Sequence, residues 1–225
     1  MKGLLSNFDI KVNDKVYVKN PESSDLGKKI VAGGISLIDD LGFEHFTFKK
    51  LADEIGSTEA SVYRYFESKH HLLVYVTFWY WGWMEYRLVF GLVNIVHPKD
   101  RLLKAVRILT EKIEQDSNFS HIDEVKLNRI IIAESTKLFF NKNVDQENLE
   151  GFFLPYKNLV QRVSSIVIEI KPNYKYPHML VTTFIESAMN QRYFADHLPQ
   201  LTDVVKGEDA VTTFYQEMVL KQLTK

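Results

Sequence analysis

Apolar residues recur every three to four positions along most of the 225-residue chain, which is the spacing of amphipathic α-helices. The first such segment begins after Ser24 and is ended by Gly42. Two short segments flank the turn at Gly56, and a long apolar segment begins at Ser68. Beyond Pro98 the pattern predicts helices over 99–113, 122–140, 146–170, 178–197 and 208–223. The sequence therefore predicts an all-α fold.

The first 24 residues differ from the rest of the chain. In "DIKVNDKVYVK" apolar residues alternate with lysines around an Asn-Asp turn, which is a weak signal for a hairpin or an extended segment. We expect residues 1–24 to form an N-terminal arm, and Ser24 or Ser23 to cap the first helix.

The longest apolar run covers 72–96 and contains Glu85 and Arg87 near its middle. Each unpaired charge costs about 2.5–3.5 kcal/mol at the centre of a bilayer. The run therefore favours a buried core helix over a membrane span. The N-terminus lacks the apolar core of a signal peptide, so we expect a cytoplasmic protein with no membrane partner.

Composition narrows the classes of chemistry. The chain has no cysteine, which excludes disulfides, thiolate nucleophiles and thiolate metal sites. Its seven histidines form no HExxH pair, and no serine stands in a GxSxG turn. His70 and His71 would point about 100° apart on a helix, which suits a polar surface better than a shared metal. We expect no enzyme, no catalytic residue, no cofactor and no metal site.

Residues 44–72 have the layout of a helix-turn-helix. Leu51, Ala52 and Ile55 form one apolar edge, and Val62 and Phe66 form another beyond the turn "GST". A short turn, a small residue at the helix crossing and an exposed final helix are what this motif needs. By spacing alone the signal is moderate, because many helical hairpins share it.

The residues themselves are more specific. The segment "FTFKKLADEIGSTEASVYRYFESKHHLL" resembles the DNA-binding segment of TetR/AcrR-family transcriptional regulators. The likeness is close over residues 25–75 and rests on helix pattern alone beyond them. The matching features are Gly42-Phe43, Thr47, Leu51-Ala52, Gly56, Tyr63, Tyr65-Phe66, Ser68-Lys69 and Leu72-Leu73. The resemblance implies a three-helix DNA-binding head over 25–72, followed by a larger helical ligand-binding and dimerisation domain over 73–225.

The resemblance also implies roles for single residues. The helix after the turn corresponds to the recognition helix, and Thr47 and Lys69 correspond to phosphate-contacting positions. Lys49 occupies a position that reaches a base in some relatives, and two tyrosine hydroxyls can reach phosphates. The candidate DNA-binding residues are Thr47, Lys49, Thr58, Glu59, Ala60, Ser61, Tyr63, Tyr65 and Lys69.

The net charge of the predicted head is unfavourable for DNA binding. Residues 25–72 hold six basic and eight acidic side chains, although phosphate neutralisation supplies most non-specific affinity. The lysines of the arm are expected to supply the missing charge. Glu59 could accept a hydrogen bond from cytosine. Alternatively, its carboxylate only interacts favourably with the helix dipole, since acidic residues are common in the first turn of helices that contact no DNA.

A ligand site is expected from the family alone, in the middle helices. The aromatic candidates are Trp79, Trp83 and Tyr86, for which ordinary core packing is the stronger reading. The polar candidates, chosen by residue type, are His121, Asn128, Arg129 and Glu134. Such walls suit a small apolar or aromatic effector.

The last two predicted helices carry apolar faces, and the family pairs them across a two-fold axis. We therefore expect a homodimer that binds a palindromic double-stranded DNA operator, most simply as a repressor released by its effector. The alternative is a helical adaptor that keeps the head's fold without specific DNA binding.

Overall fold

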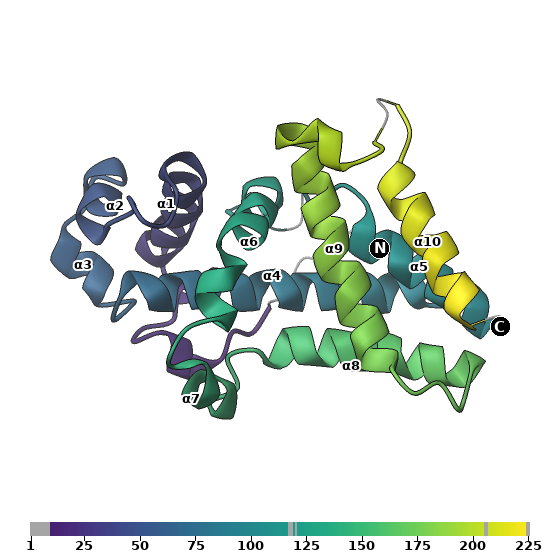
Figure 1. Ribbon diagram of the computed structural model, residues 1–225. Coiled ribbons are helices and arrows are strands. Elements are labelled where there is room, and N and C mark those ends of the chain that lie inside the picture. The colour runs from purple at the N-terminus through teal and green to yellow at the C-terminus, as the bar shows by residue number, and fades with distance from the viewer. Residues whose placement is uncertain (1–9, 117–118, 120, 205–206, 224–225) are drawn as a thin grey trace. The chain divides into compact units, whose positions relative to one another are not determined.

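The computed structural model describes residues 10–116, 119, 121–204 and 207–223 (Figure 1). The described chain is helical, as predicted. Its helices are α1 (Asp25–Leu41), α2 (Phe48–Glu54), α3 (Glu59–Tyr63), α4 (Lys69–Leu92), α5 (Pro98–Thr110), α6 (Glu124–Phe139), α7 (Val144–Leu149), α8 (Leu154–Ile170), α9 (Pro177–His197) and α10 (Ala210–Leu223). Among these residues no helix is long and apolar enough to cross a membrane.

The chain forms two compact units. The first comprises Met1–Gly82 and Ile113–Leu154, and the second comprises Trp83–Lys112 and Pro155–Lys225. The first holds the head, α1 to α3, with α6 and α7. The second holds α5, α8, α9 and α10, and α4 begins in the first and ends in the second. The functional boundaries expected at residues 24 and 72 stay predictions.

Local sequence signals set the helices of the head. Ser24, Thr47 and Thr58 are the N-caps of α1, α2 and α3, and their side chains accept backbone N–H groups of Gly27, Lys50 and Ser61. Gly56 has φ +65° between α2 and α3, a conformation that glycine adopts without strain. Behind the turn, Val62, Phe66 and Leu51 are fully buried and fix α3 to the head. The other large buried side chains around them are Phe46, Ile30, Ile35 and Leu72.

The arm does not form the expected hairpin within its described part. Residues 10–24 contain two short 3-10 turns, Asp14–Val16 and Pro21–Ser23, and Val16 is fully buried. A Cβ added at Gly27 would lie 2.2 Å from the Pro21 carbonyl oxygen, so the arm crosses α1 where only glycine fits. The alternating pattern therefore marks a segment packed onto the first unit. Residues 1–9, including Lys2, lie outside the described residues.

One predicted helix is wrong. The segment 146–170 was expected to be a single helix, but α7 ends at Leu149 and α8 begins at Leu154. Gly151 between them has φ +85°, which ends a helix, and buried Phe152 and Phe153 fill the space beside the break. Helix α3, beyond the turn at Gly56, is short and ends at Tyr63.

The second unit has a core of its own. Trp83, Leu102, Val163, Phe184 and Val219, one from each of its helices, are buried. Figure 1 shows α9 crossing α8, and the Tyr156 hydroxyl joins them by donating to the Glu186 carboxylate at 2.6 Å. Burial and this carboxylate raise the pKa of Tyr156 far above its usual value.

Candidate functional sites

The exposed surface of α2 and α3 presents the predicted recognition residues. Thr47, Lys49, Glu59 and Ala60 are exposed, and Thr58 is exposed at the N-cap of α3. A short chain of hydroxyls orders this edge. Thr58 Oγ1 lies 2.9 Å from Ser61 Oγ, which also accepts a hydrogen bond from Arg64 Nη2 at 3.1 Å. Polar groups are thus fixed along one exposed edge at the start of α3.

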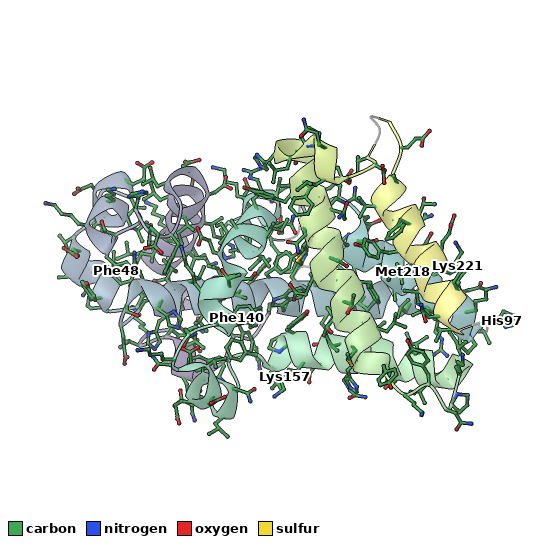
Figure 2. The ribbon with its side chains drawn as sticks, viewed as in Figure 1. Phe48, His97, Phe140, Lys157, Met218 and Lys221 are labelled. Atoms are coloured by element: carbon green, nitrogen blue, oxygen red, sulfur yellow. The ribbon has the colours of Figure 1, made fainter. Side chains whose placement is uncertain are left out.

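The two tyrosines of the head have different environments. Tyr63 is 49% exposed and its ring rests edge-on against Phe48 of α2, which is labelled in Figure 2. Tyr65 is 3% exposed, and its hydroxyl lies 2.7 Å from Ser24 Oγ at the start of α1. Tyr63 therefore has the exposure expected of a phosphate contact. Tyr65 does not, so its burial and its bond to Ser24 give no support to the predicted phosphate contact.

Tyr65 instead anchors the arm. Its backbone oxygen accepts the Val18 N–H at 2.8 Å, and the Lys19 ammonium lies 5.1 Å from its ring centroid. The hydrogen bond with Ser24 is the largest cause that lowers the pKa of Tyr65.

Lys69 lies at the start of α4, and its ammonium faces the loop between α1 and α2. Nζ donates to the carbonyl oxygens of Phe43, Glu44 and Phe46 at 2.9, 3.2 and 3.2 Å. Three acceptors match the three hydrogens of an ammonium. In this conformation Lys69 holds the loop in place. A phosphate contact by Lys69 stays a prediction that requires one of these bonds to be exchanged.

Comparisons with known proteins match this geometry. Residues 30–76, which contain α2, α3 and the start of α4, match the family of bacterial regulatory proteins, tetR family. The head is a TetR-family DNA-binding domain. The resemblance expected from the residues is thereby confirmed for this segment, and the all-α fold with a TetR-type head and a larger helical C-terminal domain is confirmed with it. No curated protein sequence matches the chain.

Solved structures extend the likeness along the chain. AibR in complex with isovaleryl coenzyme A and operator DNA is 16% identical with a TM-score of 0.59, covering 86% of this chain and 96% of AibR. A tetR-family bacterial regulatory protein from Rhodococcus RHA1 is 12% identical with a TM-score of 0.63, covering 89% and 97%. The superantigen PfiT is 15% identical with a TM-score of 0.60, covering 92% and 100%. At these identities the likeness shows the fold alone.

Helix α6 attaches to the TetR-type head by polar contacts along one face. Lys126 Nζ donates to Ser36 Oγ at 2.8 Å, and Arg129 Nε donates to Asp39 Oδ1 at 2.8 Å. Further along, Glu134 Oε1 accepts the Phe43 backbone N–H at 3.0 Å. Lys137 Nζ lies 2.9 Å from Glu44 Oε1. The end of α1 and the following loop are thus held by α6.

Three of the predicted ligand-binding residues have structural partners instead. Arg129 and Glu134 bind the head, and Asn128 accepts a hydrogen bond from the Tyr80 hydroxyl at 2.7 Å. None of the three lines a described cavity. Their choice by residue type alone missed partners that lie 48 to 91 positions away in sequence.

Of the remaining predicted ligand-binding residues, one lines a cavity of the first unit and two are buried in the core. Trp79 and Trp83 are buried, and Trp79 packs edge-on against Phe119. Tyr86 is half-buried and stacks on Phe90 with ring centroids 4.5 Å apart. His121 does line a cavity, of about 270 Å³ in the first unit, and its Nε2 lies 2.8 Å from Glu22 Oε1. Core packing thus accounts for the two tryptophans.

A larger cavity lies wholly within the second unit. This groove, of about 630 Å³, runs between the second half of α4 and α8, and we call it the α4–α8 groove. Its apolar wall includes Val89, Leu92, Val93, Ile95 and Ile166. Its charged residues form two pairs, Arg101 with Glu169, and Arg162 with Glu85 at 2.8 Å. Sequence reasoning missed it, because Arg101 and Glu169 are 68 positions apart.

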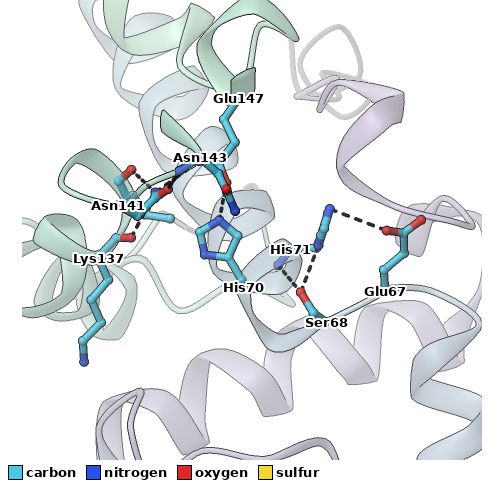
Figure 3. A network of polar contacts seen from close by, with 9 residues as sticks. Glu67, Ser68, His70, His71, Lys137, Asn141, Asn143 and Glu147 are labelled. Carbon is cyan, nitrogen blue, oxygen red and sulfur yellow. Dashed lines mark hydrogen bonds and ion pairs between the residues drawn. The ribbon is translucent and has the colours of Figure 1, made fainter. Parts of the chain in front are cut away.

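The histidine pair at the start of α4 is part of a hydrogen-bond network (Figure 3). His70 Nε2 lies 2.6 Å from Glu147 Oε1 of α7, and Asn141 Nδ2 donates to the other oxygen at 3.3 Å. His71 Nδ1 faces Ser68 Oγ at 3.0 Å. The two rings serve different neighbours, so they share no ligand. Among the described residues no group of three or more acidic or histidine side chains could hold a metal ion.

Proposed function

We propose that the protein is a ligand-responsive, DNA-binding transcriptional regulator that acts as a homodimer. The observation that carries the proposal is the TetR-family head, whose third helix presents an ordered polar edge around Thr58 and Ser61. A helix of this kind enters the major groove with its N-terminal residues against base edges. We propose that the Thr47 hydroxyl, at the N-terminus of α2, donates a hydrogen bond to a DNA phosphate.

The dimer part of the proposal rests on apolar side chains that the protomer does not bury. Leu180, Phe184, Val211 and Tyr215, from the faces expected to pair, are buried within the second unit. Other apolar side chains of α9 and α10 stay exposed, namely Met179 at 66%, Phe214 at 58% and Tyr193 at 41%. Met218, labelled in Figure 2, lies on α10 one turn after Phe214. We propose that this exposed set forms the subunit contact.

A two-fold dimer would present two heads to one DNA duplex. Recognition helices that enter successive major grooves must lie roughly 34–36 Å apart, so the operator is expected to be palindromic. An effector shifts the equilibrium only by its different affinity for two head spacings. We propose repression that the effector relieves. Helix α4 begins at the head and ends in the second unit, so a ligand against its second half can act on the first.

The structural relatives support the same reading. AibR, with the same fold, was solved with both isovaleryl coenzyme A and operator DNA. A protein of this fold therefore holds a small molecule and operator DNA together.

A second candidate function is a helical interaction protein without specific DNA binding. Two observations favour it: the acidic excess of the head, and the fold shared with the superantigen PfiT. The two candidates differ in one property, sequence-selective binding of duplex DNA.

Selection from a random duplex pool separates them. The purified chain is mixed with random DNA, bound duplexes are recovered through several rounds, and the products are sequenced. A regulator enriches an inverted repeat with half-sites centred about one or more helical turns apart. A pool that stays random through all rounds, with a folded protein, contradicts the proposal and favours the interaction protein.

A further inference from the structure

The α4–α8 groove has the size and walls of a small-molecule site. Its volume of about 630 Å³ falls in the range of roughly 300–1,000 Å³ that such sites occupy. Val89 and Val93 are both exposed and face the groove one helical turn apart, so an apolar surface is left uncovered. The groove is lined by residues of the second unit only.

Arg101 is the least satisfied charged group of the groove. Its Nη2 pairs with Glu169, but its Nε is buried and has no hydrogen-bond partner among the described residues. A buried donor without an acceptor is costly, and an arginine fork fits a carboxylate or phosphate through two parallel bonds. An acceptor would satisfy this donor, and an anionic acceptor suits the arginine fork.

The existing partner of Arg101 can be exchanged. Glu169 is 46% exposed, and ion pairs at that exposure contribute about 0–1 kcal/mol. The second pair, Arg162 with Glu85, stands seven residues earlier on α8, roughly 10 Å away along the helix. An anionic group bound at Arg101 would thus lie beside the apolar wall of the groove. The Arg162–Glu85 ion pair would lie about one and a half to two turns of α8 away.

We propose that the α4–α8 groove is the effector site, and that the effector is a small anionic amphiphile. Its carboxylate or phosphate group displaces Glu169 from Arg101 and accepts from both Nε and Nη2. Its apolar part covers Val89, Leu92 and Val93. This assignment rests on the proposed ligand-responsive function, and it adds an anionic group to the small apolar or aromatic effector expected from the sequence.

Calorimetric titration of the full chain without DNA tests the assignment. The probes are octanoate, octyl phosphate and octan-1-ol, which share a chain and differ in the head group. One or both anions are expected to bind at least about tenfold more tightly than the alcohol. The better anion then shows whether a carboxylate or a phosphate is preferred. Equal binding of all three, or no binding of either anion, overturns the proposal.

Variants locate the site. Arg101→Gln should weaken the preferred anion at least about tenfold and leave the alcohol unchanged. Arg107→Gln, on the exposed side of the same helix, is the matched control. It should leave the affinities for the preferred anion and for the alcohol unchanged. If Arg101→Gln does not fold, Glu169→Gln is the second test of the site. Removing the competing carboxylate should raise the affinity for the preferred anion severalfold. An unchanged or weakened affinity in Glu169→Gln contradicts the proposal.

The anion-binding test and the DNA-selection test can fail independently of each other. Anion binding at Arg101 together with a random DNA pool would refute the regulator and keep the site. An enriched operator together with no anion binding would refute the site and keep the regulator.

Discussion

The carboxylate of Glu134 accepts the backbone N–H of Phe43 at 3.0 Å, across 91 positions of sequence. The bond is buried, and it fixes the loop that precedes α2 to helix α6. Lys137 pairs with the other oxygen of Glu134 at 2.7 Å and also reaches Glu44. Burial alone would lower the pKa of Lys137, but hydrogen bonds with Glu134 and Glu44 raise it overall. The start of the DNA-binding helices is therefore set by a side chain outside them.

Removing this carboxylate should loosen the head. Glu134→Ala leaves the buried Phe43 N–H without an acceptor, which costs about 1–3 kcal/mol. Urea unfolding followed by circular dichroism measures the loss. Glu114→Gln, an exposed carboxylate of the same unit, is the control and should unfold like the wild type. An unchanged midpoint for Glu134→Ala would show that the loop is held by other contacts.

Substitutions of Tyr65 and Tyr63 should affect different properties, the first the stability of the fold and the second the affinity for DNA. Tyr65→Phe removes the hydroxyl bonded to Ser24 and should lower the free energy of unfolding by about 0.5–1.5 kcal/mol, without changing DNA affinity. Tyr63→Phe removes an exposed hydroxyl and should weaken DNA binding without changing stability. Unfolding curves and fluorescence anisotropy on a selected duplex measure both. The reverse pattern would mean that the assigned roles are exchanged.

Glu59 tests whether the first turn of α3 reads a base. It is exposed, and within the described residues it forms no ion pair. We expect Glu59→Ala to raise affinity for all sequences by a similar factor, because it removes a negative charge near phosphates. Selection from random DNA with this variant measures the preference. A relaxed preference at one base pair would instead make Glu59 a reader of cytosine.

Glu124 should make stability depend on pH. It is fully buried, and its Oε2 accepts the Asp116 N–H at 3.1 Å. Burial raises the pKa of Glu124 from 4.5 to about 7. Between these values the folded chain holds a proton that the unfolded chain has lost. The free energy of unfolding should therefore fall as pH rises through this window.

Glu124→Gln removes that dependence. Above the folded pKa the variant should be more stable than the wild type by roughly 1–3 kcal/mol, while near pH 4.5 the two should converge. Urea midpoints across this range measure the difference, with Glu114→Gln as the exposed control. Parallel pH profiles for wild type and Glu124→Gln would contradict a protonated Glu124.

The head could be predicted from sequence because its signals are local. Thr47 and Thr58 cap the helices that follow them, and Gly56 makes the turn, all within a few residues of their partners. The break at Gly151 was missed because apolar periodicity continues on both sides of it. The roles of Arg129 and Glu134, and the position of Arg101 in a groove, depend on residues 68 to 91 positions away. Only the folded chain brings these together, so residue type alone could not assign them.

The central claim is that the exposed surface of α2 and α3 binds operator DNA. Anisotropy titration of a selected duplex with Lys49→Ala tests it most directly, with Lys142→Ala as an exposed lysine outside the head for comparison. The account predicts an affinity loss of about tenfold for Lys49→Ala and no measurable loss for Lys142→Ala. Equal affinities for both variants and the wild type would contradict it.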